Sequence, residues 1–500
     1  MIDDRRTLQA IAPISIKEVG EVREVKKSIV RIGGLESCVN GQVIEFASGI
    51  KGIVMGFDAQ GVLGLILGYE AKVRSGEKVV SQFEPFRIPT GTGFLGRVVD
   101  VFGNPCDNKG SIIPDSFQSV FRDAPETMDR GGTDQPLETG IKIIDATIPM
   151  VKGQRQLIIG DRAMGKTTIT VDSILHQKDK NIICVYCCIG KSYSALLKVL
   201  RVLHKYEALP YTIVIQALAS APCGQQYLAP YVASTLGEYF MYKGKDVLLL
   251  LDDLTRHSWS YREISLLMER PPGREAYPGD IYYVHSMLLE RGGKLNKELG
   301  SGSMSSFSIA ETIQGDVTGY IPSNLISMTD GQILLSTSLF TRGFKPAIDF
   351  SQSVSIIGSR AQCPALKELS HPLRILFTKY NQLLALTKIK TTLSSEAEII
   401  LKRGEALSEL FSQEKNANAS LAEQIILLYA LNKGLLDDVN TEMIKYFKNN
   451  MLSKLKKACP QLISELSSGE MSLSDAAKET LDKFLADFLK AATESLSRTK

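Results

Sequence analysis

The stretch that most restricts the fold of this 500-residue chain is IIGDRAMGKTTI at residues 158–169. Its centre, GDRAMGKT, has the spacing G-x-x-x-x-G-K-T, follows the short apolar run QLIIG and opens a segment with helical periodicity. A glycine loop between a strand and a helix presents backbone N–H groups that bind phosphate oxygens. The stretch therefore predicts an α/β domain with a parallel sheet and a nucleotide site.

Within this pattern each residue type has an expected role. Lys166 brings a positive charge to the β- and γ-phosphates, and Thr167 supplies a hydroxyl to Mg²⁺. The apolar run VLLLLDD at 247–253 is the expected partner strand, whose Asp252 would hold Mg²⁺ through water while Asp253 caps the next segment. The loop residues expected to surround the phosphates are Gly160, Asp161, Arg162, Ala163, Met164 and Gly165.

Hydrolysis would also need a group that orients the attacking water. A glutamate at the end of the strand after the phosphate loop could do this, but that strand ends CCIGKSYSALL and its tip carries Lys191. A lysine is protonated at neutral pH and cannot serve as a general base. Lys191 is either a solvent-facing loop residue or part of the site, and in both cases no base is visible at this position.

Periodicity divides the chain into three regions. Residues 1–82 contain period-two segments broken by glycine, typical of a small barrel or sandwich. Residues 83–365 alternate apolar strands with helical segments, and residues 366–500 are rich in Leu, Lys, Ala, Glu and Ser with helical period, with N-cap serines in SLAEQ and SLSDAAKE. We expect a multidomain protein with an N-terminal β-barrel, a central α/β P-loop domain and a C-terminal α-helical domain.

Composition excludes some functions. The net charge of +3 gives no reason to expect nucleic acid as a partner. No run of 18 apolar residues exists, and the charged N-terminus MIDDRRTLQA does not look like a signal peptide. The eight cysteines lack a framework spacing, which favours reduced thiols in an intracellular protein. Cys184, Cys187 and Cys188 contain a CxxC without a second Cys/His pair, so core thiols are favoured over metal or redox chemistry.

Longer segments resemble the α subunit of F-type ATP synthases. They are GQRQLIIGDRAMGKTTI (153–169), LLDDLTRHSWSYREISLLMERPPGREAYPGDIYYVHSMLLER (250–291) and GDVTGYIPSNLISMTDGQILLSTSLF (315–340), with LGRVVDVFGNPCDNKG (95–110) upstream. The resemblance covers nearly the whole chain and marks it as a divergent member with a RecA-like central domain. It implies a non-catalytic α subunit that holds ATP or ADP with Mg²⁺, and family α subunits carry glutamine at the position of Lys191.

The resemblance also implies partners and a place in the cell. The α subunits alternate with β subunits in a hexameric ring around a γ stalk, with peripheral stator subunits attached, and the ring couples ion transport to ATP synthesis or hydrolysis. The membrane sector is reached only through those other subunits. The expected location is peripheral, on the cytoplasmic face of a bacterial inner membrane or an equivalent energy-coupling membrane.

The sequence departs from the family where α contributes an arginine to the neighbouring β site. The family pattern is S-V-S-R-V-G, whereas residues 353–358 read SVSIIG, so Ile356 replaces the arginine. A cation supplied in this way is worth about 10³–10⁵ in rate. Arg360 is the candidate replacement, with Arg342 or a compensating β subunit as alternatives. Ser353 stands where the family has a serine that matters for activity, or it is a small residue in a tight turn.

Two further departures concern the adenine end and the N-terminus. The family's Q-x-Q stretch keeps Gln413 but has Lys415 in second place, so weaker or less base-selective nucleotide binding is expected. The segment before the barrel is short and breaks at Pro13, which leaves room for a different stator attachment.

Three functions are therefore weighed. The favoured one is a ring subunit of a proton- or sodium-coupled rotary ATP synthase. The second is a structural, catalytically silent ring subunit of a specialised F-type-like ATPase, for which Ile356, Lys191 and Lys415 argue. The third, a secretion ATPase or an RNA translocase, needs its own catalytic glutamate, and a translocase also needs a basic, aromatic RNA-binding face, so it is disfavoured.

Overall fold

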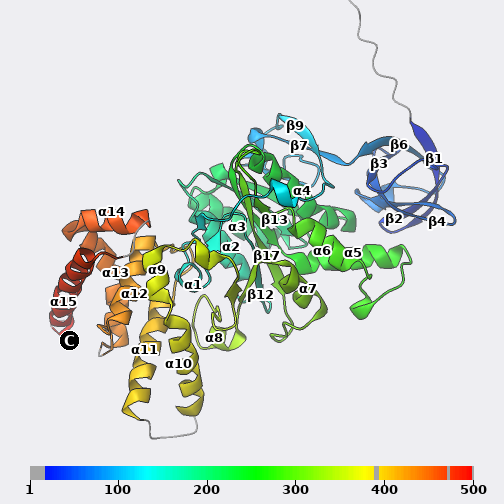
Figure 1. The fold of residues 1–500 in the computed structure, drawn as a ribbon. Coiled ribbons are helices and arrows are strands. Elements are labelled where there is room, and N and C mark those ends of the chain that lie inside the picture. The colour runs from blue at the N-terminus through cyan, green and yellow to red at the C-terminus, as the bar shows by residue number, and fades with distance from the viewer. Residues whose placement is uncertain (1–16, 388–393, 438, 470–472, 498–500) are drawn as a thin grey trace, which may run out of the picture.

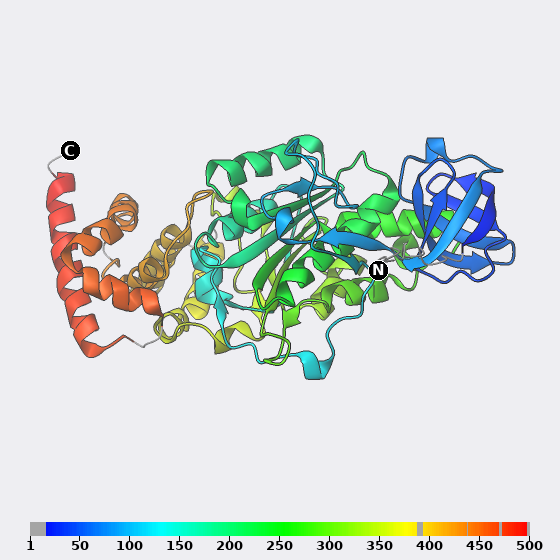
Figure 2. The ribbon, with the colours of Figure 1, turned by 90° about the horizontal axis from the view of Figure 1, so that it is seen from above.

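The computed structural model describes residues 17–387, 394–437, 439–469 and 473–497. A small barrel, a large α/β domain and a helical domain follow one another along the sequence, with the barrel and the helices at opposite ends of the central domain (Figures 1 and 2). This order is the one expected from the sequence. The predicted break at Pro13 lies outside the described residues.

The N-terminal part is a closed barrel rather than a sandwich. Its strands are antiparallel to their neighbours in the order β1-β2-β5-β4-β3-β6, and the pairing of β1 with β6 closes it. Alternate residues of the strands face a buried centre that includes Val30, Ile44 and Val79. The strands are β1 (Glu18–Lys26), β2 (Ile29–Gly33), β3 (Gln42–Phe46), β4 (Lys51–Asp58), β5 (Gly61–Ile66) and β6 (Lys78–Pro85), the last running past the expected boundary at residue 82.

The central domain is built on a nine-stranded sheet. Its order is β19-β18-β12-β17-β15-β13-β14-β8, with β16 paired to β17, and only β16 and β19 are antiparallel to their neighbours. The strands are β8 (Val98–Val99), β12 (Arg155–Gly160), β13 (Ile182–Ile189), β14 (Thr212–Ala217), β15 (Asp246–Asp252), β16 (Gly293–Lys294), β17 (Ser303–Glu311), β18 (Gly331–Leu334) and β19 (Val354–Ser355). Two small ribbons pair β7 (Arg87–Thr90) with β9 (Ser116–Ser119), and β10 (Pro136–Leu137) with β11 (Met150–Val151).

Helices cover both faces of this sheet, as its apolar strands predict. Successive residues of β12 enter different cores, Ile158 on one face and Leu157 and Ile159 on the other. The helices of the domain are α1 (Lys142–Thr147), α2 (Lys166–Leu175), α3 (Tyr193–Lys205), α4 (Cys223–Met241), α5 (Leu254–Leu267), α6 (Ile281–Leu289), α7 (Tyr320–Met328) and α8 (Thr337–Thr341).

The C-terminal domain is helical and shares a core with the nucleotide domain. Phe350 stacks on Phe377 with ring centroids 4.1 Å apart, which ties the two domains together. The predicted cap Ser420 accepts a hydrogen bond from the Glu423 N–H at 3.3 Å. The helices are α9 (Pro364–Ser370), α10 (Leu373–Thr387), α11 (Ser395–Phe411), α12 (Leu421–Asn432), α13 (Thr441–Ala458), α14 (Pro460–Ser468) and α15 (Asp475–Ser497).

The cysteine cluster lies on β13. Cys184, Cys187 and Cys188 are fully buried, and burial raises the pKa of each thiol, that of Cys188 to about 12. Their interpretation as core thiols is confirmed. Among the described helices, none has both the length and the apolar character that crossing a bilayer requires.

Candidate nucleotide site

The phosphate loop connects β12 to α2, the context that the sequence predicted. The loop turns through left-handed backbone conformations at Ala163, with φ 66°, and at Gly165, with φ 100°, which caps α2. Lys166 folds back over the loop, and its ammonium donates to the carbonyl oxygens of Gly160 and Asp161, both at 2.7 Å. Burial lowers the pKa of Lys166. Arg162 points to solvent, whereas Met164 is buried.

The side chain of Asp161 holds the loop against its neighbours. Its carboxylate accepts hydrogen bonds from the Thr312 hydroxyl at 2.6 Å, the Gly315 N–H at 2.8 Å and the Thr337 hydroxyl at 3.0 Å. Burial acts to raise the pKa of Asp161, but these hydrogen bonds bring it below its usual range. The residue therefore fixes the shape of the loop, and its oxygens face the protein.

Four side chains from three segments meet at the start of α2. The Thr167 hydroxyl donates to Asp252 Oδ2 at 2.8 Å, and the buried Tyr186 hydroxyl donates to the same oxygen at 2.8 Å. The Lys191 ammonium donates to Thr167 Oγ1 at 2.8 Å and to Asp252 Oδ1. The Lys191 side chain is 16% exposed, so the alternative of a solvent-facing loop residue is wrong.

This arrangement can be tested against the magnesium ion predicted for Thr167 and Asp252. Mg²⁺ takes oxygen ligands at about 2.0–2.1 Å in octahedral geometry. The two predicted residues do lie together, as the prediction requires. However, the Lys191 ammonium already contacts the hydroxyl oxygen of Thr167 and the free oxygen of Asp252. The residues as arranged therefore do not fit a magnesium ion.

Two more carboxylates lie in the site. Asp253 caps α5 as predicted, accepting from the Arg256 N–H at 2.9 Å, and burial together with the charge of Asp252 raises its pKa to about 6. Glu311 lies at the end of β17. Its negative charge acts to raise the pKa of Lys166, in opposition to burial, which lowers it. Glu311 was not predicted from the sequence, although it ends the buried, serine-rich strand β17 that lies between β12 and β15.

A cleft of about 270 Å³ opens beside the loop, between the two large domains. Ile141, Met164 and Phe340 line it with apolar surface, and Gln413 and Lys415 border it from the helical domain. The Gln413 amide donates to the Gly140 carbonyl at 2.8 Å and accepts from the Lys142 N–H at 3.1 Å. The predicted base-binding residue therefore lies at a cleft suited to a nucleobase, with its amide bonded to the protein backbone.

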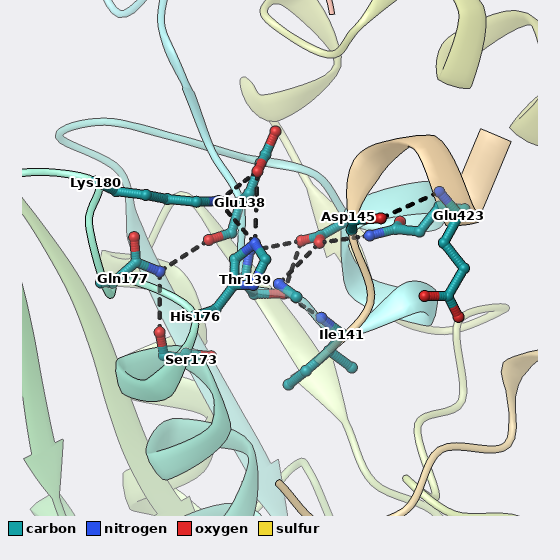
Figure 3. A network of polar contacts seen from close by, with 12 residues as sticks. Glu138, Thr139, Ile141, Asp145, Ser173, His176, Gln177, Lys180 and Glu423 are labelled. Carbon is teal, nitrogen blue, oxygen red and sulfur yellow. Dashed lines mark hydrogen bonds and ion pairs between the residues drawn. The ribbon is translucent and has the colours of Figure 1, made fainter. Parts of the chain in front are cut away.

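A polar network next to Ile141 joins both domains (Figure 3). The buried Asp145 carboxylate accepts from the Thr139 hydroxyl at 2.7 Å and from the Gln424 amide of α12 at 3.0 Å. On the other side Glu138 contacts His176 and Lys180 at the end of α2, and hydrogen bonds to them lower its pKa to about 2. The segment between β10 and α1 is thus anchored to the phosphate-loop helix and to the helical domain.

The segment 351–362 lies outside this cleft. Ser353 is fully buried, and its hydroxyl donates to the Asp349 carbonyl at 2.6 Å and accepts from the Leu334 N–H at 2.9 Å, so it holds the segment and does not face a ligand. Ile356 is 66% exposed, and Arg360 is exposed at the end of the turn Gly358–Arg360. A third arginine, Arg374 of α10, lies beside this segment and donates to the Ser353 carbonyl at 3.1 Å.

Both family models that match this sequence describe the ATP synthase alpha/beta family. The model of the ATP synthase alpha/beta family nucleotide-binding domain matches residues 140–355, and the model of the C-terminal domain of the same alpha/beta family matches residues 362–488. The sequence is 41% identical over 478 residues to the ATP synthase subunit alpha of Petrotoga mobilis, a match that covers 95% of both proteins. It is 41% identical over 476 residues to the subunit alpha of Limosilactobacillus fermentum, covering 95% of this protein and 93% of the relative.

Proposed function

This chain belongs to the ATP synthase alpha/beta family as an alpha-type subunit of a rotary F-type ATPase, and from that premise we propose that it holds ATP or ADP without hydrolysing it. The ligand would lie with its phosphates on the loop 160–165 and its base in the cleft beside Phe340 and Gln413. The subunit's part in catalysis would be played at a neighbouring subunit.

The observation that carries this proposal is the position of Lys191. A hydrolytic site needs a group that accepts a proton from water or orients it, and the tip of β13 is where such a group would meet the γ-phosphate. Here that tip carries an ammonium group bonded to Thr167 and Asp252. The cradle for the phosphates is retained while the base is missing, which supports binding without turnover.

The proposed partners follow from the family. We propose that the subunit alternates with beta-type subunits in a hexameric ring around a gamma-type stalk, with stator subunits at its periphery, coupled to proton or sodium transport. The ring would sit peripherally at an energy-coupling membrane, such as the cytoplasmic face of a bacterial inner membrane. The exposed segment around Ile356 and Arg360 would face the catalytic site of the adjacent beta-type subunit.

A binding and turnover experiment on the purified full-length protein tests the proposal. We expect the wild type to bind about one ATP per molecule and to release it intact, because the tip of β13 carries an ammonium group instead of a base. Lys166→Ala is expected to abolish binding, since it removes the ammonium that bridges the phosphate loop. Steady hydrolysis by the isolated protein that disappears in Lys166→Ala would overturn the proposal, as would a wild type that binds no nucleotide.

A further inference from the structure

The Lys191 ammonium lies where a nucleotide site of this type would place a divalent cation. An ammonium has three N–H donors, and two of them are directed at Thr167 Oγ1 and Asp252 Oδ1. The Thr167 hydroxyl gives its own proton to Asp252 Oδ2 and accepts from Lys191, so the ammonium lies against the same hydroxyl oxygen that a metal would contact. The two protein oxygens that a cation would contact, Thr167 Oγ1 and Asp252 Oδ1, are thus already bonded to Lys191.

The backbone that carries Lys191 is held on both sides. The Gly190 N–H donates to the Ala217 carbonyl at 2.7 Å, and the Ala219 N–H donates to the Lys191 carbonyl at 2.9 Å. Arg256 donates to the Gly190 carbonyl at 2.9 Å. These bonds join the tip of β13 to the end of β14 and to α5. The fold therefore fixes the backbone position from which the Lys191 side chain reaches Thr167 and Asp252.

The charges of the groups around the Lys191 ammonium are balanced by a single positive charge at this position. Asp252 is completely buried, and its second oxygen is occupied by the Thr167 and Tyr186 hydroxyls. A buried carboxylate of this kind requires a compensating charge, and Lys191 supplies it. A divalent ion placed beside the Lys191 ammonium would meet like-charge repulsion in a poorly solvated site.

We propose that Lys191 takes the place of the divalent cation, so that this protein binds a nucleoside di- or triphosphate as the metal-free anion. The inference rests on the proposed function, because it assumes that nucleotide phosphates occupy the loop 160–165. The third N–H of Lys191 would donate to a phosphate oxygen, and Lys166 would bind the phosphates from the other side. The bound nucleotide would then lack the metal that assists phosphoryl transfer, which agrees with binding without turnover.

The test is equilibrium binding of a fluorescent ATP analogue to the purified full-length protein, in excess Mg²⁺ and in excess EDTA. For the wild type we expect affinities that differ by less than about tenfold between the two conditions. In Lys191→Gln, which removes the charge and frees the hydroxyl of Thr167, affinity is expected to fall by more than about tenfold when Mg²⁺ is removed. Lys198→Gln, an exposed lysine on α3, is the matched control and should behave as the wild type.

A second readout follows the metal directly. With Mn²⁺ and ATP present, electron paramagnetic resonance should show protein-immobilised Mn²⁺ in Lys191→Gln and none in the wild type. Lys191→Met replaces Lys191→Gln if the latter does not fold, as judged by circular dichroism. Wild-type binding that requires Mg²⁺, immobilised Mn²⁺ in the wild type, or the absence of any gain in metal dependence in the variants would overturn the inference. A wild type that binds no nucleotide with or without metal would overturn the proposed function itself.

Discussion

Position 356 presents a hydrophobic side chain to solvent in the segment expected to serve a neighbouring site. Ile356 is 66% exposed, and an alkyl group cannot stabilise the charge that develops on a transferring phosphoryl group. Arg360 is exposed and ends the turn Gly358–Arg360, whereas the Arg374 guanidinium donates to the Ser353 carbonyl at 3.1 Å. Because Arg374 is tethered to the backbone, Arg360 is the better candidate for a relocated arginine.

Turnover by a ring reconstituted with beta- and gamma-type partners tests this assignment. We expect Arg360→Ala to lower the ATP turnover number by about 10³-fold or more, the effect of losing a cation supplied across an interface. Arg201→Ala, an exposed arginine on α3, is the control and should retain the wild-type rate. A large loss in Arg374→Ala with an unchanged rate in Arg360→Ala would move the role to α10. A wild-type ring without turnover would favour a silent structural ring.

At the scale of elements, β19 is an edge strand that is fixed by unusually close packing. The Ser355 hydroxyl donates to the Pro149 carbonyl at 2.6 Å and accepts from the Gly358 N–H at 3.2 Å. A Cβ atom built on Gly358 would lie 1.6 Å from the Pro149 carbonyl oxygen, so only glycine allows this approach. The path of the backbone toward Arg360 therefore depends on the absence of a side chain at one residue.

Gly358→Ala is predicted to displace this segment. We expect the free energy of unfolding to fall by about 1–3 kcal/mol, the range for an added group that a packed site cannot accept. A lower midpoint in urea would show the loss, and faster proteolysis after Arg360 would locate it. Gly132→Ala is the matched control, since its new Cβ would meet no atom within 4 Å. Equal midpoints for the two variants would contradict the prediction.

For the whole molecule, the change of the free energy of unfolding with pH depends on buried histidines and buried aspartates, whose contributions have opposite signs. Burial lowers the pKa of His257 to about 4 and that of His285 to about 3, so their contribution to stability is complete above about pH 6.5 and is lost as the pH falls. Burial raises the pKa of Asp172 and Asp253 to about 6, so their contribution is present at low pH and is lost as the pH rises through about 6.

The histidine contribution can be isolated with His285→Gln. The Asn324 amide is 2.8 Å from Nδ1 and the Ser258 hydroxyl is 3.0 Å from Nε2, which suits a neutral ring buried between helices. On going from pH 7 to pH 5, the wild type should lose about 2 kcal/mol more free energy of unfolding than the variant. Urea titrations at both pH values measure this difference, with the exposed His371→Gln as control. Equal losses in the wild type and in His285→Gln would contradict it.

Features carried by neighbouring residues were predictable from the sequence. The phosphate loop needs only a strand, two glycines, a lysine and a threonine in series, and it forms as expected between β12 and α2. The cap formed by Asp253 and the burial of the three thiols on β13 were predicted for the same reason. The N-terminal barrel was predicted as well, but the order of its strands was not, because the pairing of β1 with β6 joins residues that lie far apart in the sequence.

The chemical groups of the site follow from the amino-acid sequence alone: a lysine and a threonine on the loop, an aspartate on β15, an ammonium where hydrolases carry a carboxylate, and an isoleucine where the family has an arginine. The contacts that these groups make with one another follow from the three-dimensional fold. Lys191 meets Thr167 and Asp252 because β13 pairs directly with β15, bringing Cys188 opposite Asp252. The Ser353 side chain points inward because its hydroxyl accepts a hydrogen bond from the Leu334 N–H of β18 and donates one to the Asp349 carbonyl. Contacts between residues on different strands depend on the order of the strands in the sheet. That order is set by packing between distant parts of the chain, so local residue patterns do not predict it.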